Sequence, residues 1–167
     1  MKLLVKTFLG RFDIYDENHA CVGKIKKKMR HAAILEVTDS KGHGLSTVRK
    51  CEDTMVINTE WNENEVAFLC YRTDAEGKRI QESLIRPPMA EKAELSTKLG
   101  FFVILQKLDR SFEISLDGRN IARVTHMLSR TKEIRTCSSN IHVPIKWLEI
   151  LFACCWHMLH DDDVYMV

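Results

Sequence analysis

The sequence predicts a mainly β (α+β) domain in which antiparallel hairpins form a barrel and an apolar C-terminal helix packs in or against it. Three observations predict this fold: a hairpin-like segment recurs along the chain, apolar and polar residues alternate within each copy, and the last apolar run has no polar face. With 167 residues and 45% apolar content, the chain can bury a core without disulfides. We therefore expect one domain over residues 1–167.

Three segments of similar length carry the repeat. FDIYDENHACVGKI (12–25) and LEVTDSKGHGLSTV (35–48) align without a gap, and FEISLDGRNIARV (112–124) is one residue shorter in its turn. In each copy two large apolar residues alternate with an acidic residue, which is the period of a half-buried strand. Asp, Asn and Gly between the two halves suit tight turns, so each copy is predicted to be a hairpin.

The rest of the chain before residue 140 follows the pattern less regularly. A looser fourth copy covers residues 68–84 with its turn at Asp74–Gly77, and further strands are expected around 55–59 and 101–105. The residues PPMAEKAELSTKLG (87–100) predict a linker and a short helix that stops at Gly100, because proline is tolerated in the first turn and glycine favours the position after a helix.

The C-terminal segment PIKWLEILFACCWHMLHDDD begins at Pro144 and is apolar almost all round over residues 147–159. A helix without a polar face belongs inside a protein. Burial of its large side chains, at roughly 1.5 to 3 kcal/mol each, gives a gross term on the order of 10 kcal/mol, so its removal should unfold the domain. Charged residues interrupt this segment, and its uninterrupted apolar part is half as long as a membrane-spanning helix, so we expect no transmembrane helix.

The hairpins FDIYDENHACVGKI and FEISLDGRNIARV, followed by the helix IKWLEILFACCWHML, resemble the tubby C-terminal-like superfamily, including its small LURP-one-related members. The resemblance covers nearly the whole chain. It implies a closed barrel of about twelve strands threaded by the C-terminal helix, and the phospholipid scramblases are similar in their final apolar segment. Because tubby domains bind phosphoinositide headgroups, the resemblance implies an anionic phospholipid as a partner.

Composition limits the partners and the compartment. The net charge of +2, from 25 basic and 23 acidic residues, is too balanced for a protein that coats nucleic acid, so no nucleic-acid partner is expected. Six cysteines form no CxxC pair, which favours reduced thiols, and the first residues lack the apolar core and cleavage site of a signal peptide. We expect a cytoplasmic protein that is peripheral to a membrane where it binds lipid.

The densest cationic feature is KIKKKMRH (24–31). If this segment is a strand, its alternate cations share one face and form a row that suits phosphate groups. Arg49 and Lys50 are weaker candidates for the same site. The competing interpretation is a solvated strand face whose lysines discourage edge pairing. The candidate headgroup-binding residues are Lys24, Lys26, Lys28, Arg30, Arg49 and Lys50.

Other potentially reactive residues favour structural roles. His157 and His160 followed by Asp161–Asp163 imitate a metal cluster, but a buried histidine and a solvated acidic end explain them as well. Cys154 and Cys155 lie in the most apolar run and are expected to fill the core. The chain has no GxSxG, HExxH, Walker loop or GxGxxG motif. We therefore expect no catalytic residues, no metal and no cofactor.

The leading hypothesis is a non-enzymatic module that binds a phospholipid headgroup or a protein at the cytoplasmic membrane face. Three alternatives remain open. A lipocalin-like barrel that encloses a small ligand would need its helix outside. An enzyme would need a pocket where titratable groups such as Asp109, His126 and His142 converge. A purely structural or interaction module would show an exposed apolar patch and no response to anions.

Overall fold

The computed structural model describes residues 1–28, 31–59, 62–80, 90–137 and 141–159. Within these residues, twelve strands precede a single helix, α1 (Ile145–Leu159). The strands are β1 (Lys2–Phe8), β2 (Arg11–Tyr15), β3 (Cys21–Lys28), β4 (His31–Asp39), β5 (Gly44–Cys51), β6 (Thr54–Thr59), β7 (Asn62–Tyr71), β8 (Ala90–Thr97), β9 (Gly100–Gln106), β10 (Phe112–Leu116), β11 (Arg119–Thr125) and β12 (Thr131–Thr136).

The strands form one closed antiparallel barrel. Each strand pairs with the next in the chain, and β1 pairs with β12 from Lys2 opposite Arg135 to Lys6 opposite Thr131. Closure leaves no exposed sheet edge that could pair with another chain. Because the strands alternate in direction, all turns that follow odd-numbered strands lie at one rim of the barrel, and all turns that follow even-numbered strands lie at the other.

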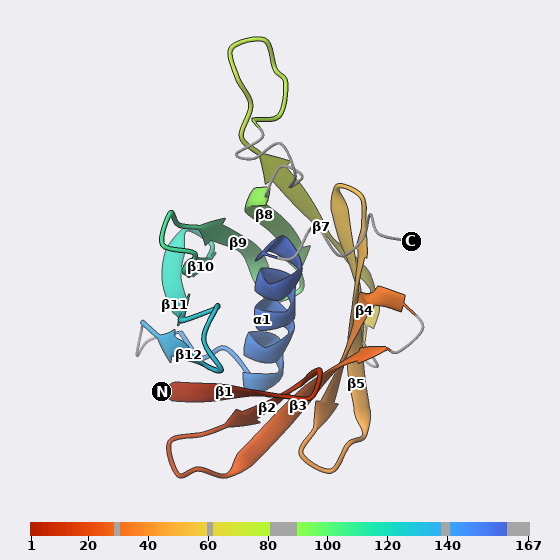
Figure 1. The fold of residues 1–167 in the computed structure, drawn as a ribbon, viewed down its shortest axis with the longest axis vertical. Coiled ribbons are helices and arrows are strands. Elements are labelled where there is room, and N and C mark those ends of the chain that lie inside the picture. The colour runs from red at the N-terminus through yellow and green to blue at the C-terminus, as the bar shows by residue number, and fades with distance from the viewer. Residues whose placement is uncertain (29–30, 60–61, 81–89, 138–140, 160–167) are drawn as a thin grey trace.

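Helix α1 runs through the ring of strands (Figure 1). Near its start, the carboxylate of Glu149 faces Gly23 at the beginning of β3. Near its end, the ring of Trp156 lies 5.8 Å from Nζ of Lys27, at the end of β3. The helix therefore enters at the rim of the even-to-odd turns, here called the entry edge, and ends at the rim of the odd-to-even turns, the exit edge.

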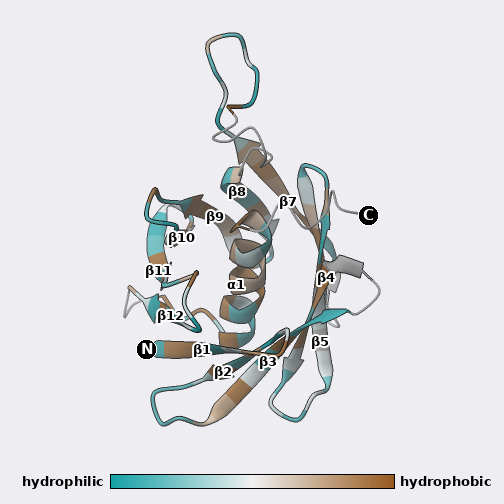
Figure 2. Ribbon diagram, in the orientation of Figure 1, coloured by the Kyte–Doolittle hydropathy of each residue, from teal (hydrophilic) through white to brown (hydrophobic). Residues whose placement is uncertain are grey.

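The core lies between α1 and the inward faces of the strands. Twelve of the fifteen helix residues are buried. They meet apolar side chains at alternate strand positions such as Leu3 and Val5 on β1. In Figure 2, α1 is brown and pale apart from a teal section near its start, the strands carry brown bands, and the outlying loops are mostly teal. Cys154 and Cys155 are fully buried free thiols, and desolvation raises the pKa of Cys154 to about 12. This confirms that they are core residues.

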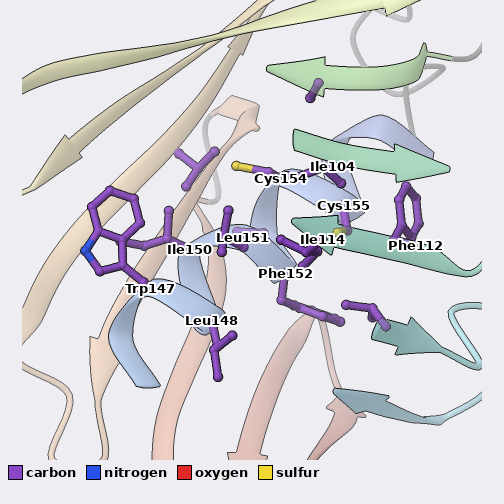
Figure 3. Packing of buried hydrophobic residues seen from close by; sticks show 14 of the residues in the cluster. Ile104, Phe112, Ile114, Trp147, Leu148, Ile150, Leu151, Phe152, Cys154 and Cys155 are labelled. Atoms are coloured by element: carbon purple, nitrogen blue, oxygen red, sulfur yellow. The ribbon is translucent and has the colours of Figure 1, made fainter. Parts of the chain in front are cut away.

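Aromatic contacts fix the helix at both ends. Near the start of α1, Trp147 stacks on Phe102 of β9 with ring centroids 5.6 Å apart. Toward its end, Phe12 of β2 meets the edges of Phe152 at 5.5 Å and Trp156 at 4.6 Å. Figure 3 shows the side chains of α1 radiating in different directions toward the surrounding strands. Such ring pairs add about 0.5 to 1.5 kcal/mol each beyond the burial of their area.

The structure confirms the predicted fold class. The three repeat copies form the hairpins β2–β3, β4–β5 and β10–β11. The fourth copy has its predicted turn, where the backbone N–H of Asp74 donates to the carbonyl of Lys78 at 2.9 Å, but Thr73 and Arg79 are joined by an isolated bridge, and the strand that follows β7 and pairs with it is β8. Of the described residues, none form a helix long and apolar enough to span a membrane. The linker residues Pro87 and Pro88 lie outside the described residues.

One predicted element is wrong. Residues 90–97 form strand β8 rather than a short helix before Gly100, although the sequence AEKAELST is rich in good helix formers. Ala93 and Leu95 point into the core, and β8 pairs with both β7 and β9. Two hydrogen-bonded neighbours and burial in a closed wall outweigh local propensity, which is a fraction of a kcal/mol per residue.

The helix is expected to be indispensable to the barrel. Leu151 is fully buried, and a carboxylate at that position would be desolvated without a partner, at a cost of several kcal/mol, comparable to the whole stability of a domain. We predict that Leu151→Asp abolishes soluble expression, measured by fractionation of the lysate. Leu108→Asp, at a leucine that is 86% exposed, is the control and should express normally. A folded Leu151→Asp protein would contradict the plug role of α1.

Candidate functional site

Lys24, Lys26 and Lys28 form a row on the outer face of β3, here called the β3 lysine row. Gly23 and Ile25, which alternate with them, are buried and face the core, as the sequence pattern predicted. Lys24 is half-buried, and its ammonium donates a hydrogen bond to the carbonyl of Ser40 at 2.8 Å. Lys26 and Lys28 are exposed, and Lys28 ends the strand at the exit edge.

The other predicted cations are divided between the two faces of the wall. Arg49 is exposed on β5, whereas Lys50 is only 3% exposed and faces inward like Val48. Neighbouring residues of a strand point to opposite faces, so one site on the outer surface cannot use both. Arg30 lies outside the described residues. The outer candidates that the structure brings to one side of the barrel are therefore Lys24, Lys26, Lys28 and Arg49.

Cross-strand neighbours of the β3 lysine row add both a cation and carboxylates. Lys26 lies between Arg11 on β2 and Glu36 on β4. Lys24 lies opposite Asp13, whose carboxylate receives the Arg11 guanidinium at 3.2 Å. The surface around the row is therefore cationic but partly neutralised, which weakens it as a site for one isolated phosphate and leaves it suited to a surface that carries many anions.

A second group of cations faces inward at the exit edge, and sequence reasoning did not find it. Lys132 is 2% exposed, and its ammonium donates to Oγ1 of Thr7 at 2.8 Å and to the carbonyl of Ser129 at 2.6 Å. Both Lys132 and Lys27 lie within 6 Å of the Trp156 ring. Burial lowers the pKa of Lys132. Cations at this end are favourable because the C-terminus of a helix carries partial negative charge.

Glu149 is the acidic counterpart near the other end of α1. It is 1% exposed, and desolvation raises its pKa to about 8; Asp39 adds to the rise and Lys146 opposes it. A Cβ on Gly23 would lie 1.9 Å from its Oε1, so any other residue at position 23 would displace this carboxyl. Among the described residues, Oε1 has no hydrogen-bond partner. The carboxyl is therefore held neutral near pH 7.

A half-open cleft of about 200 Å³ lies at the exit edge between the β7–β8 and β9–β10 connections. Three cations line it, but Arg72 is paired with Glu91 at 3.2 Å and Lys107 with Glu113 at 2.8 Å. The charges that line the cleft are largely neutralised, and it joins turns that are distant in sequence, so no local motif could have revealed it. Its lining residues are Arg72, Ile80, Ala90, Glu91, Gln106, Lys107, Leu108 and Arg110.

The residues considered for catalysis do not converge. Asp109 and His126 are exposed in separate turns at the exit edge, and His142 is exposed before α1, on the entry side. The pKa of Asp109 is lowered by hydrogen bonds from Ser111 and by Arg123, so it remains an ionised surface group. His157 is buried with Nε2 3.1 Å from the carbonyl of Val48, whereas His160 and Asp161–Asp163 lie outside the described residues.

No protein-family model matches the chain, and no curated protein matches it either. A protein from Arabidopsis thaliana with a solved crystal structure is similar to this chain at 14% sequence identity. The match covers 96% of this chain and 89% of the Arabidopsis chain, with a TM-score of 0.49. The function is therefore inferred from the residues of this chain.

The buried carboxyl of Glu149 predicts a pH dependence of stability. Its pKa in the folded state, about 8, exceeds its ordinary value of 4.5. Between these values the unfolded chain releases the proton and the folded protein keeps it, so stability falls as the pH rises from about 4.5 to 8 and levels off above. Glu149→Gln removes this loss and should stabilise the protein at pH 8 by on the order of a few kcal/mol relative to wild type.

Urea denaturation at several values between pH 5 and pH 9 measures the effect. Glu76→Gln, at an exposed turn residue, is the matched control and should follow the wild-type curve. The same pH dependence in wild type and Glu149→Gln would show that the carboxyl is already ionised in the fold.

Proposed function

We propose that this protein is a non-enzymatic, tubby-like or LURP-one-like barrel that binds anionic phospholipid headgroups at the cytoplasmic face of a membrane. The observation that carries the proposal is the β3 lysine row, an ordered line of cations on the outside of a barrel wall. Lys26 and Lys28 are exposed and stand beside Arg11, and Arg49 lies two strands away near the same rim.

The architecture supports this class of function because a ligand can reach only the outside of the barrel. Side chains of α1 occupy the interior, where a lipocalin-like protein would hold its ligand. The groups that an enzyme would need, Asp109, His126 and His142, stand at separate places on the rims. Protein binding remains the second outcome of the test.

The expected strength of the interaction is modest. Each cation near an anionic leaflet contributes about 1 kcal/mol, so Lys24, Lys26, Lys28 and Arg49 supply roughly 4 kcal/mol before Asp13 and Glu36 are considered. That corresponds to a dissociation constant of about 1 mM at best. Headgroup attraction through the row therefore needs further contacts to hold the protein on a membrane.

Reversing two exposed cations tests the site. We predict that Lys26→Glu with Lys28→Glu lowers binding to phosphatidylserine or phosphoinositide vesicles at physiological salt by about tenfold or more, because attraction becomes repulsion at both positions. The melting temperature should stay nearly unchanged, since both side chains are exposed. Co-sedimentation with neutral, phosphatidylserine and phosphoinositide vesicles measures the binding.

Lys98→Glu with Arg119→Glu is the matched control. Both side chains are exposed at the entry edge, in the β8–β9 turn and at the start of β11, so this variant has the same net charge with the reversal placed away from β3 at the opposite rim. Equal losses in the two variants would reduce the effect to overall charge and reject the site. Failure of wild type to bind any of the vesicles would reject the lipid proposal and favour a protein partner.

A further inference from the structure

Three neighbouring turns at the exit edge each present a leucine to solvent. Leu9 in the β1–β2 turn is 90% exposed, Leu108 in the β9–β10 turn is 86% exposed, and Leu128 in the β11–β12 turn is 69% exposed. In the part of the chain that the structure describes, these are the three most exposed large apolar side chains. Single exposed leucines are ordinary, but three on consecutive turns of one rim form a pattern.

Each of these leucines is followed two residues later by an arginine. The triplets are Leu9–Arg11, Leu108–Arg110 and Leu128–Arg130, and together they are called the Leu-x-Arg edge. Arg11 also lies over the ring of Phe8, 5.3 Å from its centroid, and Phe8 is itself 55% exposed. Asp109, between Leu108 and Arg110, is the acidic exception, and its carboxylate lies 3.5 Å from the guanidinium of Arg123. Apart from it, the three triplets combine apolar tips with cations. That is the chemistry of the boundary between lipid headgroups and acyl chains.

The three turns are adjacent in space. The barrel order from β9 through β10, β11, β12 and β1 to β2 places them in succession along the rim. The backbone N–H of Thr7 donates to the carbonyl of Arg130 at 2.9 Å, which ties the first turn to the third. Strands lie about 4.8 Å apart, so neighbouring turns of this rim are spaced by about 10 Å and the leucines span about 20 Å.

Leu9 occupies a position that suits other residues better. Leu9 and Gly10 both have positive φ, 42° and 79°, as a type I′ hairpin turn requires. The β10–β11 turn has the same form, with φ of 49° and 76°, and uses Asp117 and Gly118. Asparagine and aspartate are favoured at the first position, and a leucine there is strained. An exposed leucine in this conformation gains nothing from the fold.

We infer that the Leu-x-Arg edge inserts into the surface of an anionic lipid bilayer, with leucines among the acyl chains and arginines among the headgroup phosphates. This inference rests on the proposed function and adds the contacts that the β3 lysine row lacks. Lys28 ends β3 at the same rim, beside the β1–β2 turn, so a bilayer that meets this rim also meets the end of the β3 lysine row. The acidic β5–β6 turn, Glu52–Asp53, is separated from these turns along the rim by β3 and β4 on one side and by β7 and β8 on the other.

Polar substitution of the three leucines tests the insertion. Leu9→Asn with Leu108→Ser and Leu128→Ser should weaken co-sedimentation with vesicles of phosphatidylcholine and phosphatidylserine by about tenfold or more. The loss should persist in high salt, because it removes apolar rather than charged contacts. Leu9→Asn alone should weaken binding and leave the melting temperature unchanged or raised, since asparagine suits the turn.

Leu99→Ser is the matched control, a partly exposed leucine in the two-residue β8–β9 turn at the entry edge. It should bind vesicles like wild type. Contact with the bilayer is then tested directly by Leu9→Trp and Leu99→Trp, using vesicles whose acyl chains carry bromine as a quencher. Fluorescence added at position 9 should be quenched, whereas fluorescence added at position 99 should not.

The outcomes separate this inference from the proposed function. If Lys26→Glu with Lys28→Glu lowers binding and the triple leucine variant does not, the headgroup site stands and insertion is rejected. If the leucine variant lowers binding and charge reversal has no effect, insertion stands without the lysine row. Equal quenching at positions 9 and 99, or no binding of wild type at any salt concentration, rejects the Leu-x-Arg edge as a membrane contact.

Discussion

The packing of α1 inside the barrel is the interaction on which the rest of the structure depends. A twelve-stranded barrel is wider than the eight-stranded barrels whose interiors side chains alone can fill. The interior of this barrel must therefore be filled by an element that is apolar on every side, and residues 147–159 form such a helix. The helix in turn determines which strand residues face inward, because each strand must place apolar side chains at alternate positions to contact it. Closure and filling therefore require each other.

Polar groups inside the barrel favour one direction of the helix. Lys27 and Lys132 lie beside Trp156, near the negative C-terminal end of the α1 dipole, whereas the neutral carboxyl of Glu149 lies toward the other end of the helix. A helix inserted in the opposite direction would bring the carboxyl toward Phe12 and the cations toward Trp147. The close approach of Glu149 to Gly23 also favours this orientation of the helix, because a side chain at position 23 would occupy the space of the carboxyl group. These polar groups lower stability and favour one orientation.

The sequence was informative where local pattern and global structure agree. The three hairpin repeats and the apolar helix were predictable because the periods of their residues match strands and a helix buried on all sides. Strand β8 was not, since its helix-forming residues adopt a strand only through pairing with β7 and β9. The β3 lysine row was predictable because successive side chains of a strand alternate between its two faces. The inward Lys132 and the leucine turns needed the barrel order, which brings Lys132 to Thr7, 125 positions away in the chain.

Filling the interior moves any ligand site of this kind to the outer wall or the rims. The wall carries cations at strand positions whose side chains point outward. The rims carry the residues of the turns. Turn sequences usually follow conformational preference, as Asp117–Gly118 does in the β10–β11 hairpin. Leu9 departs from that preference although its side chain is 90% exposed, so neither packing nor backbone geometry accounts for it. Local strain without structural benefit is most often found at functional sites, and contact with a bilayer would bury the side chain that the fold leaves exposed.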